Sequence, residues 1–149
     1  MGIMNKIHSY EHRAQYYETD QMGCVHHSNY IRWFEEARTD LLNQAGFSYK
    51  RMEEEGLMCP VLNVYAEYKS MVHYQDVVEI SSKITAFNGI KFTVEYTVTD
   101  KETKEVRTVG KSEHCILNHE FKPIRLQKEN KEVYDLFMEL NQSDVISHK

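Results

Sequence analysis

Several features that would assign the class of this 149-residue chain directly are missing from its sequence. No apolar run is long enough to span a bilayer, and the first residues lack the apolar core of a signal peptide. The three cysteines, Cys24, Cys59 and Cys115, are an odd number without C-x-x-C spacing, which favours a reducing cytoplasm. The histidines show no metal-ligand spacing, so no metal site is predicted. The net charge of −5 argues against general nucleic-acid binding.

The length predicts one domain over residues 1–149, with a core over about residues 8–126 and a C-terminal helix over about residues 127–141. A chain of this size buries roughly 70% of its unfolded surface and needs no disulfides for stability.

The periodicity of the first third predicts a strand followed by a long helix. Polar and apolar residues alternate over residues 8–17, which is typical of a strand. Apolar residues then recur at helical spacing, which predicts a helix over about residues 29–45. Ser28 is the candidate N-cap, and Gly46 stands where a helix C-terminus favours glycine.

The second half reads as antiparallel strands. We expect extended segments over residues 60–68, 77–87, 90–99 and 106–118, with a short helical turn over residues 48–55 before them. Asn88-Gly89 is a strong hairpin signal between the middle two strands. One long helix with an antiparallel sheet wrapped on it is an α+β fold.

The stretch from Tyr16 to Gly46 carries the candidate chemistry. It places the carboxylate of Asp20 and the bend at Gly23 just before the start of the long helix. A helix N-terminus presents free backbone N–H groups and about half a positive charge, which can stabilise a developing oxyanion. This combination predicts acyl-transfer chemistry.

The motif that runs from Asp20 through Gly23 to the letters WFEEAR resembles the signature of hot-dog-fold acyl-CoA thioesterases, in the 4-hydroxybenzoyl-CoA thioesterase-like family. The branch associated with the Tol-Pal system is the most similar, and the likeness covers about residues 8–126. The resemblance implies a hot-dog fold, homodimers or homotetramers, and active sites at subunit interfaces. It implies an acyl-CoA substrate, in which coenzyme A is part of the substrate, and no separate cofactor.

The resemblance also implies roles for single residues. Asp20 corresponds to the catalytic carboxylate, His27 supplies a backbone N–H at the helix start, and Tyr16 is implicated in some members. We expect the other motif positions to contact the substrate: Gly23, Val25, His26, Asn29 and Tyr30. His26 departs from the aromatic residue that relatives often carry, which affects the shape of the acyl pocket.

Each of these residues also has a structural interpretation. Asp20 can be an Asx-turn residue, and as a catalyst it could act either as a general base or as a nucleophile. For His27 the backbone N–H is a stronger candidate than the ring. Tyr16 is more often a buried sheet tyrosine than a catalytic residue, and the first turn around Tyr30 is core as well as a possible acyl contact. Cys24 is interpreted as a small apolar filler.

Two rival functions stay open on the sequence. One is hydrolysis of a thioester carried by an acyl-carrier protein, and the other is non-hydrolytic binding of acyl-CoA. The sequence does not identify the acyl group, nor which basic residues meet the phosphates of coenzyme A.

Overall fold

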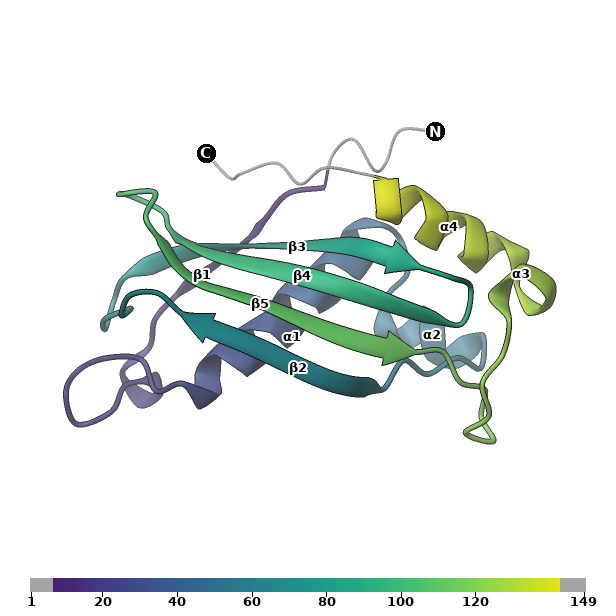
Figure 1. Cartoon of the computed structure of the whole chain (residues 1–149), viewed down its shortest axis with the longest axis horizontal. Helices are drawn as coiled ribbons and strands as arrows, with labels where there is room; N and C mark the ends of the chain where they lie inside the picture. Colours follow the sequence, from purple (N-terminus) through teal and green to yellow (C-terminus); the bar gives the residue numbers. More distant parts are fainter. Residues whose placement is uncertain (1–6, 143–149) are drawn as a thin grey trace.

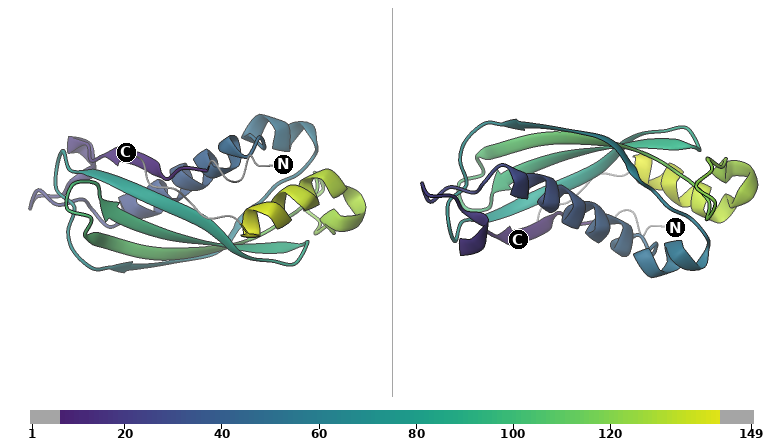
Figure 2. Two further views of the ribbon diagram at one scale, coloured as in Figure 1. Left: turned by 90° about the horizontal axis from the view of Figure 1, so that it is seen from above. Right: turned by 90° about the horizontal axis from the view of Figure 1, so that it is seen from below.

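One long helix, α1 (Ser28–Gln44), lies across one face of a five-stranded antiparallel sheet (Figures 1 and 2). The structure is a computed structural model, and it describes residues 7–142. The strands are β1 (Tyr10–Arg13), β2 (Val61–Tyr68), β3 (Val77–Phe87), β4 (Lys91–Asp100) and β5 (Val106–Cys115), arranged in the order β1-β3-β4-β5-β2. The predicted α+β architecture is confirmed.

The predicted long helix is confirmed because its apolar positions form one continuous face. That face buries Tyr30, Trp33, Phe34, Ala37, Leu41 and Leu42 against the sheet. The Phe34 ring stacks on Tyr96 of β4, with ring centroids 4.4 Å apart. Gly110 of β5 makes room for it, since a Cβ there would lie 2.4 Å from the Phe34 ring.

The hairpin predicted at Asn88-Gly89 joins β3 to β4. The Asn88 side chain accepts hydrogen bonds from the backbone N–H groups of Ile90 and Lys91, and Gly89 takes a φ of +90° that favours glycine. Side chains on β4 alternate between the buried helix-facing side and the outer face, as the sequence predicted.

Three predicted elements are wrong in their extent. The last strand ends at Cys115 and not at residue 118. The first strand ends at Arg13 and not at residue 17, because a 3₁₀ turn, η2 (Tyr16–Glu18), follows directly after the last bond to the β3 side, which Ala14 makes to Asp76. The expected C-terminal helix consists of α3 (Leu126–Glu129) and α4 (Lys131–Gln142), which Asn130 separates in an extended conformation.

The C-terminal helices close one end of the core. Phe137 of α4 is buried against the rings of Phe47, Phe87 and Phe92, where Phe47 lies between α1 and the short helix α2 (Tyr49–Glu54). Ser48 caps α2 by accepting a hydrogen bond from the backbone N–H of Arg51.

The edge strand β2 is exposed along nearly its whole length, in contrast to the central strands. Its apolar and aromatic side chains include Val61, Leu62, Tyr65 and Tyr68, each about half exposed. A long edge strand of this composition is open to pairing with another chain.

Candidate active site

The loop between η2 and α1 is a tight, hydrogen-bonded turn. Thr19 pairs with Val25 as an isolated antiparallel bridge, and the backbone N–H of Asp20 donates to the Cys24 carbonyl at 2.8 Å. Gly23 closes the turn with a φ of +78°, a conformation that other residues rarely adopt. The loop therefore holds Asp20 and the start of α1 on its two arms.

The two carboxylate oxygens of Asp20 have different surroundings. Oδ1 accepts hydrogen bonds from the backbone N–H groups of Met22 (2.8 Å) and Cys24 (3.3 Å), which makes the expected Asx turn. Within residues 7–142, Oδ2 has no hydrogen-bond donor. Asp20 is half-buried. One oxygen therefore fixes the orientation of the carboxylate, and the other is free to accept a proton or to attack a carbonyl.

The first turn of α1 leaves one backbone donor free. The N–H of Ser28 donates to the His26 ring nitrogen Nδ1 (3.2 Å), and the next two N–H groups donate to the carbonyls of His26 and His27. Among the residues described, nothing accepts a hydrogen bond from the N–H of His27. The prediction that Ser28 is the N-cap is wrong: His27 occupies that position, and the His26 ring takes over the capping contact.

A free carboxylate oxygen and a free N–H at the positive end of a 17-residue helix form a plausible pair for acyl transfer. The carboxylate can activate water or attack, while the N–H can stabilise negative charge on the carbonyl oxygen.

A second carboxylate, Glu18, anchors this loop from inside the protein. It is 5% exposed, and it accepts hydrogen bonds from the Trp33 indole (2.8 Å) and the Gln15 backbone N–H (2.8 Å) and pairs with His12 (2.9 Å). Burial alone would raise the pKa of Glu18, but the hydrogen bonds from His12, Gln15 and Trp33 lower that pKa below its usual range.

The backbone of Glu18 reaches the helix start as well. Its carbonyl accepts hydrogen bonds from the His26 N–H (2.8 Å) and the Asn29 side-chain amide (2.8 Å). Glu18 thus links β1, η2, the loop and α1. This role was not predicted, because its only local signal in the sequence is the capping-box spacing of Gln15 and Glu18.

The remaining predicted site residues divide into loop and core positions. Val25 and Tyr30 are buried, and Tyr30 packs on Trp33 and on Tyr68 of β2. Gly23 and His26 are exposed, and the His26 ring stacks on that of His27 at 4.2 Å.

Tyr16 is not the buried sheet tyrosine that was expected. It lies in η2, is 75% exposed and meets Tyr74 edge-on. The strand ends before it, so its ring has no sheet to pack against.

A cavity of about 660 Å³ lies beside the C-terminal half of α1. Its walls are mainly apolar and come from α1, α2, β4, the segment before β2 and the segment after β5. Residues on these walls include Leu42, Met52, Leu57, Cys59, Phe92 and Leu117. Arg38 of α1 brings a positive charge into the same lining.

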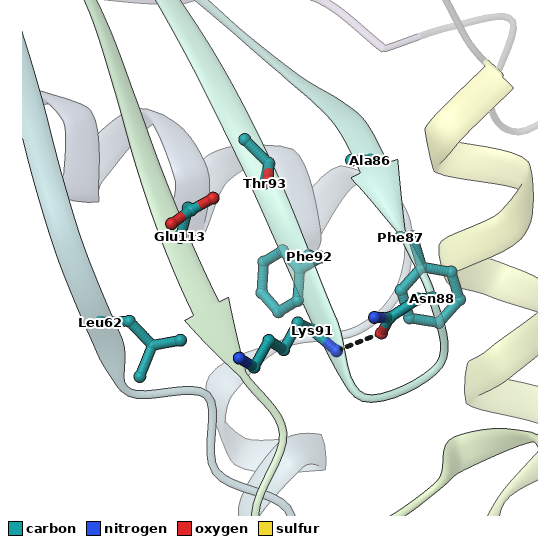
Figure 3. A pocket seen from close by; sticks show the side chains of 8 residues that line it. All are labelled: Leu62, Ala86, Phe87, Asn88, Lys91, Phe92, Thr93 and Glu113. Atoms are coloured by element: carbon teal, nitrogen blue, oxygen red, sulfur yellow. Dashed lines mark hydrogen bonds between the residues drawn. The ribbon is translucent and has the colours of Figure 1, made fainter.

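A second hollow, of about 340 Å³, lies near the β3–β4 hairpin (Figure 3). Leu62, Lys91 and Glu113 line it, and Glu113 already accepts a hydrogen bond from Asn63. Asp20 and His27 do not contribute to this lining, so the hollow is not part of the candidate site.

Over residues 7–142, no cluster of three or more His, Cys, Asp or Glu side chains has the geometry of a metal site. No helix in the same range is both long and apolar enough to cross a bilayer.

Comparison with known proteins decides the family. The sequence matches the thioesterase-like superfamily over residues 15–136. The chain belongs to this superfamily. The matched range includes Asp20, the loop and α1, and therefore the whole segment that carries the candidate site.

Individual relatives agree with the thioesterase-like assignment. YneP of Bacillus subtilis is 35% identical over 118 residues, which are 79% of this chain and 86% of YneP. The acyl-CoA thioester hydrolase YbgC of Escherichia coli O157:H7 is 27% identical over 116 residues, or 78% of this chain and 87% of YbgC. The crystal structure of a DHNA-CoA thioesterase from Staphylococcus aureus superposes with a TM-score of 0.84 at 28% identity, covering 95% of this chain and 98% of that one. The hot-dog fold is thereby confirmed.

Proposed function

We propose that this chain hydrolyses acyl-CoA thioesters to free acids and coenzyme A at Asp20. The observation that carries the proposal is the free Oδ2 of Asp20 on the same tight loop as the free N–H of His27. Relatives named for acyl-CoA and DHNA-CoA hydrolysis support coenzyme A rather than a carrier protein as the thiol.

The chemistry follows from these two groups. The His27 N–H donates to the thioester carbonyl oxygen, where negative charge develops. Asp20 takes a proton from water while the water oxygen attacks the carbonyl carbon. The carbon–sulfur bond then breaks, and the departing thiolate takes up a proton. In the alternative route Oδ2 attacks the carbonyl carbon, the carbon–sulfur bond breaks and the departing thiolate takes up a proton. Water then hydrolyses the resulting anhydride, which releases the acid and restores the Asp20 carboxylate.

We also propose that two copies share each site, with a homodimer as the minimum assembly and a tetramer as a further possibility. Antiparallel pairing of two β2 strands about a two-fold axis would set Val61 of one copy opposite Tyr68 of the other. Tyr68 contacts His27, with its hydroxyl 3.5 Å from the His27 carbonyl, and the wall residues Cys59 and Pro60 directly precede Val61. The cavity of one copy would then approach the Asp20 loop of the other.

The distance within one copy supports this sharing. Arg38 lies eleven residues beyond His27 on α1, or about 16 Å along the helix axis. A short acyl group held at the His27 N–H would not reach the cavity of its own chain. As part of the proposal, the three free cysteines fit a cytoplasmic location.

Replacing Asp20 with asparagine tests the proposed function. Asparagine keeps an oxygen for the Asx turn but cannot serve as an anionic base or nucleophile. Asp20→Asn should keep its melting temperature while thiol release from a panel of acyl-CoAs falls roughly 10²–10⁴-fold. Near-normal turnover by the folded variant would show that Asp20 is only a turn residue.

A further inference from the structure

Arg38 is the one arginine that lines the 660 Å³ cavity, and its guanidinium is held by a chain of buried polar groups. Its Nη1 donates to the Tyr96 hydroxyl at 2.9 Å. That hydroxyl lies 2.6 Å from Ser112 Oγ, which lies 2.7 Å from His114 Nε2. The three residues that extend this series of hydrogen bonds from Arg38 are Tyr96, Ser112 and His114, and each is at most 2% exposed.

The hydrogen bonds from Arg38 to His114 all run in one direction, each residue donating to the next, when His114 is neutral. Burial, together with the positive charge of Arg38, lowers the pKa of His114 to about 4, although the backbone carbonyls of Cys59 and Pro60 act in the opposite direction. A neutral His114 accepts at Nε2 from Ser112, which accepts from Tyr96, which accepts from Arg38. The only charge in this series of hydrogen bonds is that of Arg38, and the other ring nitrogen of His114, Nδ1, is buried without a partner among the described residues.

The guanidinium keeps most of its hydrogen-bonding capacity. It has five N–H donors, and Tyr96 is its one acceptor among the residues described. No described carboxylate lies within 4.0 Å of it, although Glu35 and Glu53 line the exposed side of the same cavity. Arg38 is half-buried, so water can satisfy the remaining donors until a ligand with an acceptor oxygen replaces that water.

We infer that Arg38 selects acyl groups that carry a hydrogen-bond-accepting oxygen at their far end. The acyl body would contact the apolar walls, and the oxygen, from a carboxylate or a hydroxyl group, would accept from the guanidinium. Tyr96 is then a positioning residue, since it holds Arg38 at the wall. This inference rests on the proposed function, because it assigns the acyl half of that substrate.

Binding to the Asp20→Asn variant tests the inference without requiring turnover. Calorimetry would compare hexanoyl-CoA with adipoyl-CoA, which adds a terminal carboxylate, and phenylacetyl-CoA with 4-hydroxyphenylacetyl-CoA, which adds a hydroxyl. We expect the oxygen-bearing member of at least one pair to bind roughly tenfold more tightly, the scale of one charge-assisted hydrogen bond. The pair that responds shows which oxygen is recognised.

The same titrations in Arg38→Gln and Tyr96→Phe, each combined with Asp20→Asn, assign the preference to the guanidinium. Arg38→Gln should reduce the preference to less than about twofold, and Tyr96→Phe should weaken it while retaining the charge. Thermal melting shows whether each variant is folded, and if Arg38→Gln is not, Tyr96→Phe decides. Equal binding within both pairs, or a preference that survives the substitution, overturns the inference. Thiol release by the unmodified protein tests the proposed function separately.

Discussion

The two ends of α1 differ in how they are built and in what they can contribute. At the N-terminal end, a loop of backbone hydrogen bonds and the buried Glu18 fix the Asp20 carboxylate on the same loop as the free N–H of His27. Toward the C-terminal end, the same helix borders a mainly apolar cavity in which Arg38 is a fixed charge. One end is therefore suited to reacting with a thioester carbonyl, and the other to holding an acyl group.

The largest loss of activity is expected when one backbone N–H is removed at the N-terminal end of α1. His27 has a φ of −57°, which a proline ring can adopt, and its N–H bonds to no other described residue. His27→Pro should therefore fold while thiol release falls roughly 10²–10³-fold, as expected for the loss of one oxyanion donor. His27→Ala, which keeps the N–H, should retain most of the activity. Equal losses in both variants would assign the role to the imidazole instead.

The pH dependence of stability probes the cavity end. His114 has a pKa of about 4 when folded and an ordinary value near 6.5 when unfolded, so the unfolded chain binds more protons between these values. The free energy of unfolding should therefore be highest above pH 6.5 and fall by roughly 3 kcal/mol as the pH drops toward 4.

Urea unfolding of the wild type, His114→Gln and the exposed-residue control His119→Gln would measure this effect between pH 4.5 and 7.5. Removing the titrating group in His114→Gln should flatten the slope, and His119→Gln should leave it unchanged. A slope that persists in His114→Gln would mean that another group causes it.

Replacing Glu18, which anchors the loop at the N-terminal end of α1, should have a smaller effect on the free energy of unfolding. Glu18→Gln removes the charge that supports three hydrogen-bonding partners, so we expect a loss of about 2 kcal/mol in the free energy of unfolding. Glu36→Gln is the matched control, because Glu36 is exposed and accepts from Tyr10 at the surface. Denaturant melts of both variants would check this. Similar small losses would argue that Glu18 does not anchor the loop.

The contrast between the two ends also explains what the sequence predicted. α1 and the Asn88-Gly89 hairpin follow from local periodicity and turn chemistry, and both are confirmed. The extent of the first strand does not follow from local periodicity, because the alternating pattern continues into the 3₁₀ turn η2, where the chain has left its partner strand β3.

The same limit applies to the site. The loop motif predicted Asp20 and His27 together because they are seven residues apart. Glu18 bonds to Trp33, which is fifteen residues away, and the walls of the cavity beside Arg38 come from five segments of the chain. Side chains joined only by tertiary packing leave no local pattern to identify them.

A mixed dimer tests most directly the claim that both ends of α1 serve one reaction. One copy would carry Asp20→Asn, and the other Thr39→Trp, which fills the cavity from an exposed position on its lining. Each variant alone should be nearly inactive. The purified mixed dimer should recover about half of the wild-type thiol release, because one of its two sites combines an intact loop with an intact cavity. A mixed dimer as inactive as its parents, or a monomer by light scattering, would contradict the account.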